Sequence, residues 1–170
     1  MFIHSIDEDV SLRMFNENDA EEFYHLTIHS KEYLREWLGW LDHINCIEDT
    51  IQSIRSRLKA FAANGGFPTS FAIIYHGEMA GTISFNTIDK QNKVGKIGYW
   101  LGEEFQGNGI MVRAFPSIIK YGFKDLELNK IEVHVATENN KSRVLPELFG
   151  FEEEGRLRQA EWQNGCMTIM

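Results

Sequence analysis

Apolar and polar residues alternate in several short stretches of the chain, and this alternation predicts β-strands. The segment Val10-Ser-Leu-Arg-Met-Phe15 alternates along its length and predicts a first strand. Three further runs, rich in β-branched and aromatic residues, follow one another across short turns at 69–76, 79–88 and 94–101. Strands joined by such short turns predict an antiparallel meander.

Other stretches place apolar residues three or four positions apart, which predicts helices. The first helix is expected to follow a capping Asn16 or Asn18 and to run to about Ser30. The segment Lys31 to Leu41 is rich in leucine and tryptophan and predicts a second, amphipathic helix. A third helix runs from Ile47 to a glycine pair that ends it.

The second half of the chain predicts a strand, a helix and a parallel strand in succession. The strand 96–101 leads through a turn into a helix over 110–123, and a strand over 128–136 follows. Pro116 should bend that helix, because proline removes one backbone hydrogen bond. Three last elements are expected, namely a short helix ending at Leu148, a strand over 151–157 and a strand beginning at Cys166. This order predicts a mixed α/β fold in a single domain over 1–170.

The composition limits the classes of function. The net charge is −8 and the basic residues form no block, which argues against a nucleic-acid-binding protein. An acidic surface suits a cationic partner, although the same charge also keeps many proteins dispersed. The N-terminus has no signal-peptide pattern, no apolar run is long enough to span a membrane, and the two cysteines suggest no disulfide framework. We therefore expect a cytoplasmic protein.

The turn between the strand 96–101 and the next helix has the chemistry of an anion site. It carries Gln106-Gly107-Asn108-Gly109, and glycines allow positive φ and close approach of a ligand to the backbone. The N-terminus of the following helix adds unpaired amide groups and partial positive charge. Neither the dinucleotide fingerprint nor the Walker loop fits these residues. The pattern predicts a phosphate or pyrophosphate cradle of another kind, with a plain strand-to-helix turn as the alternative.

The segment Gln106 to Met111 resembles the Gln/Arg-x-x-Gly-x-Gly/Ala coenzyme A loop of the GNAT N-acetyltransferases. The stretches "IGYWLGEEFQGNGIM" and "ATENNKSRVLPELFGF" resemble the RimJ/RimL branch, the ribosomal-protein N-terminal acetyltransferases. Met111 departs from the small residue of the wider family. The resemblance implies a mixed sheet whose two central strands splay apart, with the cofactor helix between them. Family members usually continue beyond the point where this chain stops, so we expect a short or truncated C-terminal strand.

The resemblance also implies which residues hold acetyl-CoA. The backbone N–H of Leu101 would polarise the thioester carbonyl. Asn139 would bond the pantetheine arm or cap the end of the strand, with Asn140 as a weaker candidate. The pyrophosphate would lie against the loop and first helical turn, at Gln106, Gly107, Asn108, Gly109, Ile110 and Met111. Arg113 could add a phosphate contact, or it could be an ordinary exposed helical arginine.

Two residues are candidate catalytic groups by the same resemblance. Glu161 would take the proton of the ammonium, with Glu103 and Glu104 as alternative bases. Ser142, which is also expected beside the cofactor, would protonate the leaving thiolate, because the tyrosine position of many family members is Pro146 here. Ser142 could instead cap its helix. The expected mechanism is direct transfer, without a covalent enzyme intermediate.

The acceptor pocket is expected at four aromatic residues, Tyr33, Trp37, Trp40 and Trp162. The alternative is that the first three pack a helix onto the sheet. The resemblance implies a protein N-terminus as acceptor, and a polyamine, an aminoglycoside, an amino acid or a non-catalytic acyl-CoA-binding role stays open. The family also implies a homo-oligomer. His25 and His29 lie four residues apart, but without an evident third ligand we expect no metal site.

Overall fold

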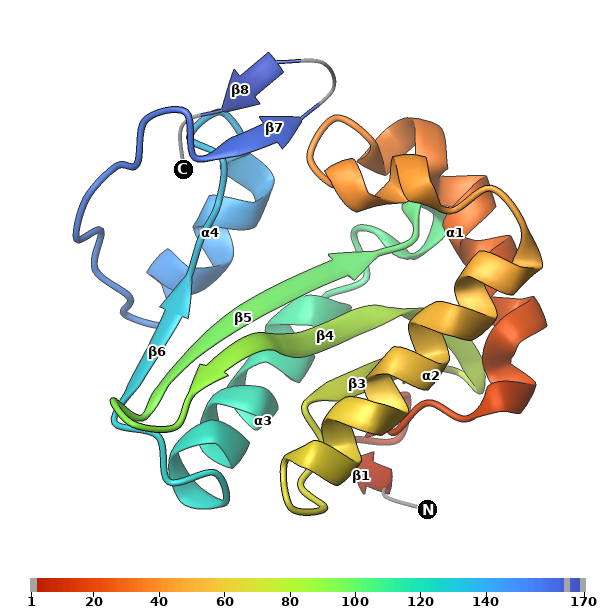
Figure 1. The fold of residues 1–170 in the computed structure, drawn as a ribbon, viewed down its shortest axis with the longest axis horizontal. Coiled ribbons are helices and arrows are strands. Elements are labelled where there is room, and N and C mark those ends of the chain that lie inside the picture. Colours follow the sequence, from red (N-terminus) through yellow and green to blue (C-terminus); the bar gives the residue numbers. More distant parts are fainter. Residues whose placement is uncertain (1–2, 164–165, 169–170) are drawn as a thin grey trace.

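The computed structural model describes residues 3–163 and 166–168, with side chains described as far as Glu161. A six-stranded sheet has the order β1-β2-β3-β4-β5-β6, and β7 and β8 pair separately (Figure 1). The strands are β1 Ile3–Ser5, β2 Val10–Arg13, β3 Ser70–Tyr75, β4 Glu78–Asp89, β5 Val94–Leu101, β6 Lys130–Val133, β7 Glu161–Gln163 and β8 Cys166–Thr168. The helices are α1 Ala20–Leu34, α2 Ile47–Ala63, α3 Ile110–Lys124 and α4 Asn140–Leu148, with short 3-10 turns η1 Glu17–Asp19, η2 Gly39–His43 and η3 Glu103–Phe105.

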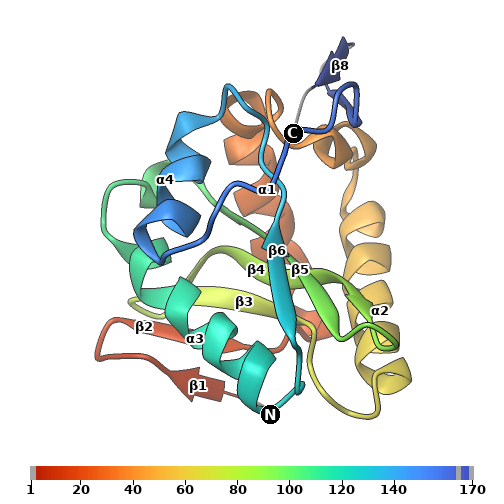
Figure 2. The same cartoon turned by 90° about the vertical axis from the view of Figure 1, so that its left-hand side faces the viewer.

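The sheet has one apolar core on each face. Strands β1 to β5 are antiparallel, β6 is parallel to β5, and α2 and α3 lie on opposite sides of the sheet (Figure 2). Ile97 on β5 packs into the core that includes Phe115 of α3, whereas Trp100 packs into the core that includes Phe23 of α1. This alternation follows from the two-residue period of a strand. The predicted meander and mixed α/β fold are confirmed.

The two central strands separate toward the end of β5, as the family resemblance implied. Their pairing starts at Val94 opposite Lys130 and ends at Ile97 opposite Val133. The predicted strand 128–136 is therefore too long, because only Lys130–Val133 forms a strand and pairs with β5. Figure 1 shows β6 turning toward α4 while β5 continues toward α1. The last four residues of β5 thus have β4 on one side and a divergent β6 on the other.

The predicted helix over 31–41 is wrong. Its first turn completes α1, and the Leu34 carbonyl then accepts hydrogen bonds from the N–H groups of both Trp37 and Leu38, at 3.0 Å each. Leu38 leaves the helical region with φ −122° and ψ 84°, and η2 begins at Gly39. The apolar spacing of this segment reflects burial of residues such as Leu41 in an irregular turn.

The predicted strand over 151–157 is also wrong. The chain there forms no strand, and every residue from 152 to 157 is exposed. Glu153 instead pairs with Arg143 of α4 at 3.2 Å and with Arg156 at 2.9 Å. A run of three glutamates before a glycine has no apolar alternate face to bury, so it offers nothing for sheet formation.

Helix α3 runs through Pro116 to Lys124, with the proline on its exposed side. Its apolar residues Ala114, Phe115 and Ile118 are buried, and the half-buried Ile119 packs against the same core. In the described part of the chain, no helix combines the length and the apolar character that crossing a membrane requires.

Candidate active site

The turn between β5 and α3 forms an open loop at the N-terminus of a helix. Gly107 has φ +80° and Gly109 has φ +66°, and a Cβ at either position would meet no atom within 4 Å. Gly109 is the N-cap of α3, and no side chain caps the helix there. The first-turn amides, beginning with Ile110 and Met111, therefore point out of the helix end without a side-chain acceptor. This open, amide-lined end fits an anionic group.

The two polar side chains of the loop act on the backbone around them. Gln106 Nε2 donates to the Leu101 carbonyl at 3.1 Å and so fixes the loop to the end of β5. Asn108 Nδ2 donates to the Phe105 carbonyl at 3.2 Å. Both side chains therefore shape the loop, and the sequence alone did not distinguish this role from ligand contact.

A cavity of about 640 Å³ opens beside this loop, between α1, β5, α3 and α4. It brings together seven of the residues predicted for the site, namely Tyr33, Trp37, Leu101, Gln106, Met111, Asn139 and Ser142. Gly107, Asn108, Gly109 and Ile110 are continuous in the chain with two of these but do not line the cavity itself.

The backbone of Leu101 presents its donor to this cavity. The Gly102 N–H donates to the Ala80 carbonyl on β4 at 2.8 Å. Successive N–H groups point to opposite sides of a strand, so the Leu101 N–H points away from β4. The Leu101 carbonyl lies on the same side, where Gln106 reaches it. Because β6 has separated there, the edge of β5 is open to a ligand that can pair with it.

Ser142 lies on the opposite wall of the cavity, in the first turn of α4. The N-cap of α4 is Asn139, whose Oδ1 accepts a hydrogen bond from the Ser142 N–H at 3.2 Å. Ser142 is therefore not the helix cap, which removes one alternative for it. In the described part of the chain its half-buried hydroxyl has no hydrogen-bond partner.

Tyr99 holds α4 against β5, a role that sequence reasoning missed. Its hydroxyl donates to the Ser142 carbonyl at 2.8 Å, and its ring lines the cavity. Burial raises the pKa of Tyr99, so the hydroxyl stays protonated as the donor of this bond. Alternation along 94–101 placed Tyr99 on the same face as Ile97, but nothing in the sequence named its partner.

The other end of the cavity is formed by α1 and α4 together. Lys141 Nζ donates to the Tyr33 hydroxyl at 3.0 Å and lies 5.3 Å from the centre of the Tyr33 ring. Glu36 and Glu138 also line this end. These three charged residues were not among the sequence predictions, because they come from the end of α1 and the start of α4, which are distant in the chain.

Two predicted pocket residues are not placed at the cavity wall. The ring of Trp40 packs against the ring of Trp100 with centroids 5.9 Å apart, and it is 37% exposed. It supports the cavity from behind, since Trp100 lines it. Trp162 belongs to β7, but its side chain lies outside the described residues.

The structure does not bring the predicted base to the cavity wall. Glu161 is half-buried on β7 and is not one of the residues that line the cavity. The alternatives Glu103 and Glu104 are exposed in η3 and do not line it either. Among the residues whose side chains the structure describes, the carboxylates at the wall are those of Glu36 and Glu138.

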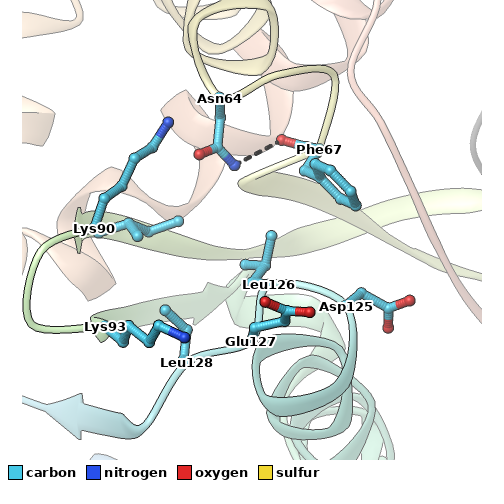
Figure 3. Close-up of a pocket in the computed structure, with 9 residues that line it drawn as sticks. Asn64, Phe67, Lys90, Lys93, Asp125, Leu126, Glu127 and Leu128 are labelled. Atoms are coloured by element: carbon cyan, nitrogen blue, oxygen red, sulfur yellow. Dashed lines mark hydrogen bonds between the residues drawn. The ribbon is translucent and has the colours of Figure 1, made fainter.

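A second cavity, of about 400 Å³, lies at the other end of the sheet, where α2, the β4–β5 turn and the end of α3 meet (Figure 3). Asn64 Nδ2 donates to the Phe67 carbonyl there at 3.1 Å. Its wall contains none of the residues predicted for the site. Within the described residues, no group of three or more His, Cys, Asp or Glu side chains could hold a metal ion.

Comparison with known proteins places these features in a family. The model of the acetyltransferase (GNAT) domain matches residues 9–152. The chain is 32% identical to YdaF of Bacillus subtilis strain 168, over 97% of this chain and 90% of YdaF. It is 31% identical to the ribosomal-protein-serine acetyltransferase of Escherichia coli K12, over 94% and 88% of the two chains.

A solved structure resembles the fold over almost its whole length. It is RimL, a ribosomal L7/L12 alpha-N-protein acetyltransferase, in complex with coenzyme A. The TM-score is 0.93 at 27% identity, with 99% of this chain and 94% of that chain covered.

Proposed function

The chain belongs to the GNAT acetyltransferase family, and we propose that it transfers the acetyl group of acetyl-CoA to the N-terminal α-amine of a protein, such as a ribosomal protein. One observation carries the proposal. The open edge of β5 at Leu101 lies at a cavity that is also lined by Gln106 and Met111, the two residues that flank the glycine-containing turn before α3. The similarity to a ribosomal-protein-serine acetyltransferase and to RimL supports the choice of acceptor.

The residues present fit the cofactor. Gly107 and Gly109 leave open space before a helix end that no side chain caps, which suits a pyrophosphate. The edge of β5 at Tyr99 lies beyond the last residue that pairs with β6, so its backbone groups are available to a pantetheine amide. We therefore assign Gly107, Gly109, Ile110 and Met111 to the phosphates, and the backbone edge at Tyr99 to the arm.

Acetyl-CoA, when bound, supplies an activated thioester that a neutral amine can attack. The Leu101 N–H offers a fixed donor where negative charge develops on a carbonyl oxygen. The Ser142 Oγ holds a proton at the wall of the same cavity, from which it can protonate a leaving thiolate. Glu161 accepts the proton of the ammonium, through water because it is not at the wall.

Tyr33 and Trp37 form the apolar part of the acceptor wall, with Trp40 behind it. We place Trp162 in the same wall from the family resemblance. Because ribosomal proteins and acetyl-CoA meet in the cytoplasm, we place the reaction there. The homo-oligomer implied by the family belongs to the same proposal.

The proposed function predicts selective turnover of peptides. Thiol release from acetyl-CoA should be fastest with peptides that begin with Ser, Ala or Thr, because a short side chain beside the α-amine fits an apolar wall. Spermidine, an aminoglycoside and free amino acids form the comparison arms of the same assay. A preference for spermidine or the aminoglycoside would make the protein a small-amine acetyltransferase. No turnover with any acceptor, combined with binding of acetyl-CoA, would make it a binding module.

The role of Glu161 predicts a pH-dependent defect. Glu161→Gln should lower kcat/KM for a peptide about tenfold near pH 7, and the defect should shrink as the pH rises toward about 9. The reason is that a peptide α-amine, with a pKa of about 8, loses its proton unaided at the higher pH. The measurement is a pH–rate profile of both proteins.

Matched variants identify the base if it is another residue. Glu103→Gln and Glu104→Gln should leave the profile unchanged, since both residues are exposed away from the wall. An unchanged rate in Glu161→Gln would show that the assignment is wrong. A lower rate in Glu36→Gln or Glu138→Gln would assign the role of base to that residue at the cavity wall.

A further inference from the structure

Arg113, in the first turn of α3, donates hydrogen bonds to two backbone carbonyls of the glycine loop, residues 106–109. Its Nη2 donates to the Asn108 carbonyl at 3.1 Å, and its Nε donates to the Gly109 carbonyl at 3.2 Å. The Gly109 carbonyl also accepts the Arg113 backbone N–H at 3.3 Å, the first hydrogen bond of the helix. Two consecutive peptide units of the loop are therefore fixed by one side chain.

Fixing these carbonyls also fixes the amides that share their peptide planes. The Asn108 carbonyl is joined to the Gly109 N–H, and the Gly109 carbonyl is joined to the Ile110 N–H. In a trans peptide the C=O and N–H bonds point in opposite directions. Because Arg113 holds both carbonyls on its own side, the Gly109 and Ile110 amides point to the other side, out of the helix end. Gly109, which lies between the two planes, would otherwise let them rotate at little cost.

The guanidinium of Arg113 is held on its outer side by the β1–β2 turn. Its Nη1 lies 3.0 Å from Asp7 Oδ2 and 3.7 Å from Asp9 Oδ2. Asp7 is fixed in turn, because its Oδ1 accepts the backbone N–H groups of Asp9 at 2.9 Å and Val10 at 2.8 Å. These amides, that of Val10 above all, together with the guanidinium, lower the pKa of the Asp7 carboxyl. The guanidinium of Arg113 already donates hydrogen bonds to two carbonyls and a carboxylate. Arg113 is therefore held within the protein rather than free to bind a phosphate.

We propose that Arg113, oriented by Asp7, is a positioning residue that aims the Gly109 and Ile110 amides at the pyrophosphate of coenzyme A without touching it. This inference rests on the proposed cofactor site. It adds that the β1–β2 turn, through Asp7, helps to hold that site in place. It replaces the phosphate contact that the sequence left open for this residue.

The test compares variants that separate hydrogen bonding from charge. Arg113→Met removes the donors and keeps the length, whereas Arg113→Gln keeps an N–H donor without the charge. The dissociation constant of coenzyme A is measured by titration calorimetry at low and high salt. We expect about tenfold weaker binding for Arg113→Met and a smaller loss for Arg113→Gln, the tenfold change being the typical effect of losing one or two hydrogen bonds. Asp7→Asn should show a loss between the two.

A second readout tests whether the effect is confined to the pyrophosphate. S-acetylpantetheine, which lacks that group, should have the same KM in Arg113→Met and the parent protein. At saturating acetyl-CoA, kcat should be unchanged, because the reacting atoms are held elsewhere. The control is Arg55→Met, which removes a similar surface ion pair, Arg55 to Glu17 at 3.0 Å, far from the loop and should not alter coenzyme A binding.

Three outcomes would overturn the proposal. Equal losses in Arg113→Gln and Arg113→Met that disappear at high salt would mean a direct charge contact with phosphate. Unchanged coenzyme A affinity in Arg113→Met would mean that the loop keeps its conformation without the hydrogen bonds from Arg113. An equal loss with S-acetylpantetheine would mean general damage to the fold. If the parent protein itself bound no coenzyme A, the proposed function would fail instead, and calorimetry shows this without any acceptor.

Discussion

Gly109→Val is expected to weaken binding of acetyl-CoA by at least about a hundredfold. Gly109 has φ +66°, where a β-branched residue is strongly disfavoured, so valine would distort the loop. The valine side chain would also enter the open space before α3, where a Cβ meets no atom within 4 Å. Losing two or more charge-assisted hydrogen bonds to phosphate accounts for a change of this size. Titration with coenzyme A and the KM for acetyl-CoA both measure it.

The chain offers a matched control for the backbone strain. Gly65 has φ +71°, and a Cβ there would also meet no atom within 4 Å. It follows the C-terminal end of α2 and does not line the candidate active-site cavity. Gly65→Val should lower the melting temperature by a similar amount and leave coenzyme A binding unchanged. If Gly109→Val bound coenzyme A as well as the parent protein, the glycine loop would not be the cofactor cradle.

Ser142→Ala is expected to lower kcat about a hundredfold with little change in melting temperature. The rate falls because the thiolate loses its proton donor, and general acid catalysis typically contributes a factor of this order. Stability is kept because Asn139, not Ser142, supplies the side-chain cap of α4. The measurements are the rate at saturating substrates and the melting temperature of the same preparation.

Asn139→Ala is the control that distinguishes loss of the helix cap from loss of the proton donor. It removes the acceptor of the Ser142 N–H and should cost about 1 kcal/mol of stability, the usual value of an N-cap. A variant Ser142→Ala with a lower melting temperature and a normal rate would reverse the assignment and make Ser142 structural.

The sequence predicted the elements that rest on short-range rules. The short turn predicted between the runs 69–76 and 79–88 is present, and His76 and Gly77 adopt positive φ there between β3 and β4. The predicted start at Ile47 and the glycine pair bounded α2 correctly, because helix ends depend on neighbours in the chain. The resemblance carried by Gln106 to Met111 is confirmed by the match to the GNAT domain.

The failed predictions share a physical cause. Apolar spacing over 31–41 is compatible with a helix and with an irregular turn that buries the same residues, and the double hydrogen bond to the Leu34 carbonyl selects the turn. A strand at 151–157 would have needed a buried face, which the glutamates cannot provide. The first strand, β1, is only three residues long and was missed because so short a segment carries no period.

The sequence by itself indicated the fold family, which the match to the GNAT domain confirms, because the motifs that carry the resemblance are local in the chain. The same resemblance proposed the cofactor loop and the candidate residues Ser142 and Leu101. Only the tertiary structure decided which groups face one another. It paired Tyr99 with the Ser142 carbonyl, Lys141 with Tyr33, and Arg113 with Asp7. It also left Glu161 off the cavity wall. Such partners come from separate elements, and their distances follow from how helices pack on a sheet, which residue order alone does not specify.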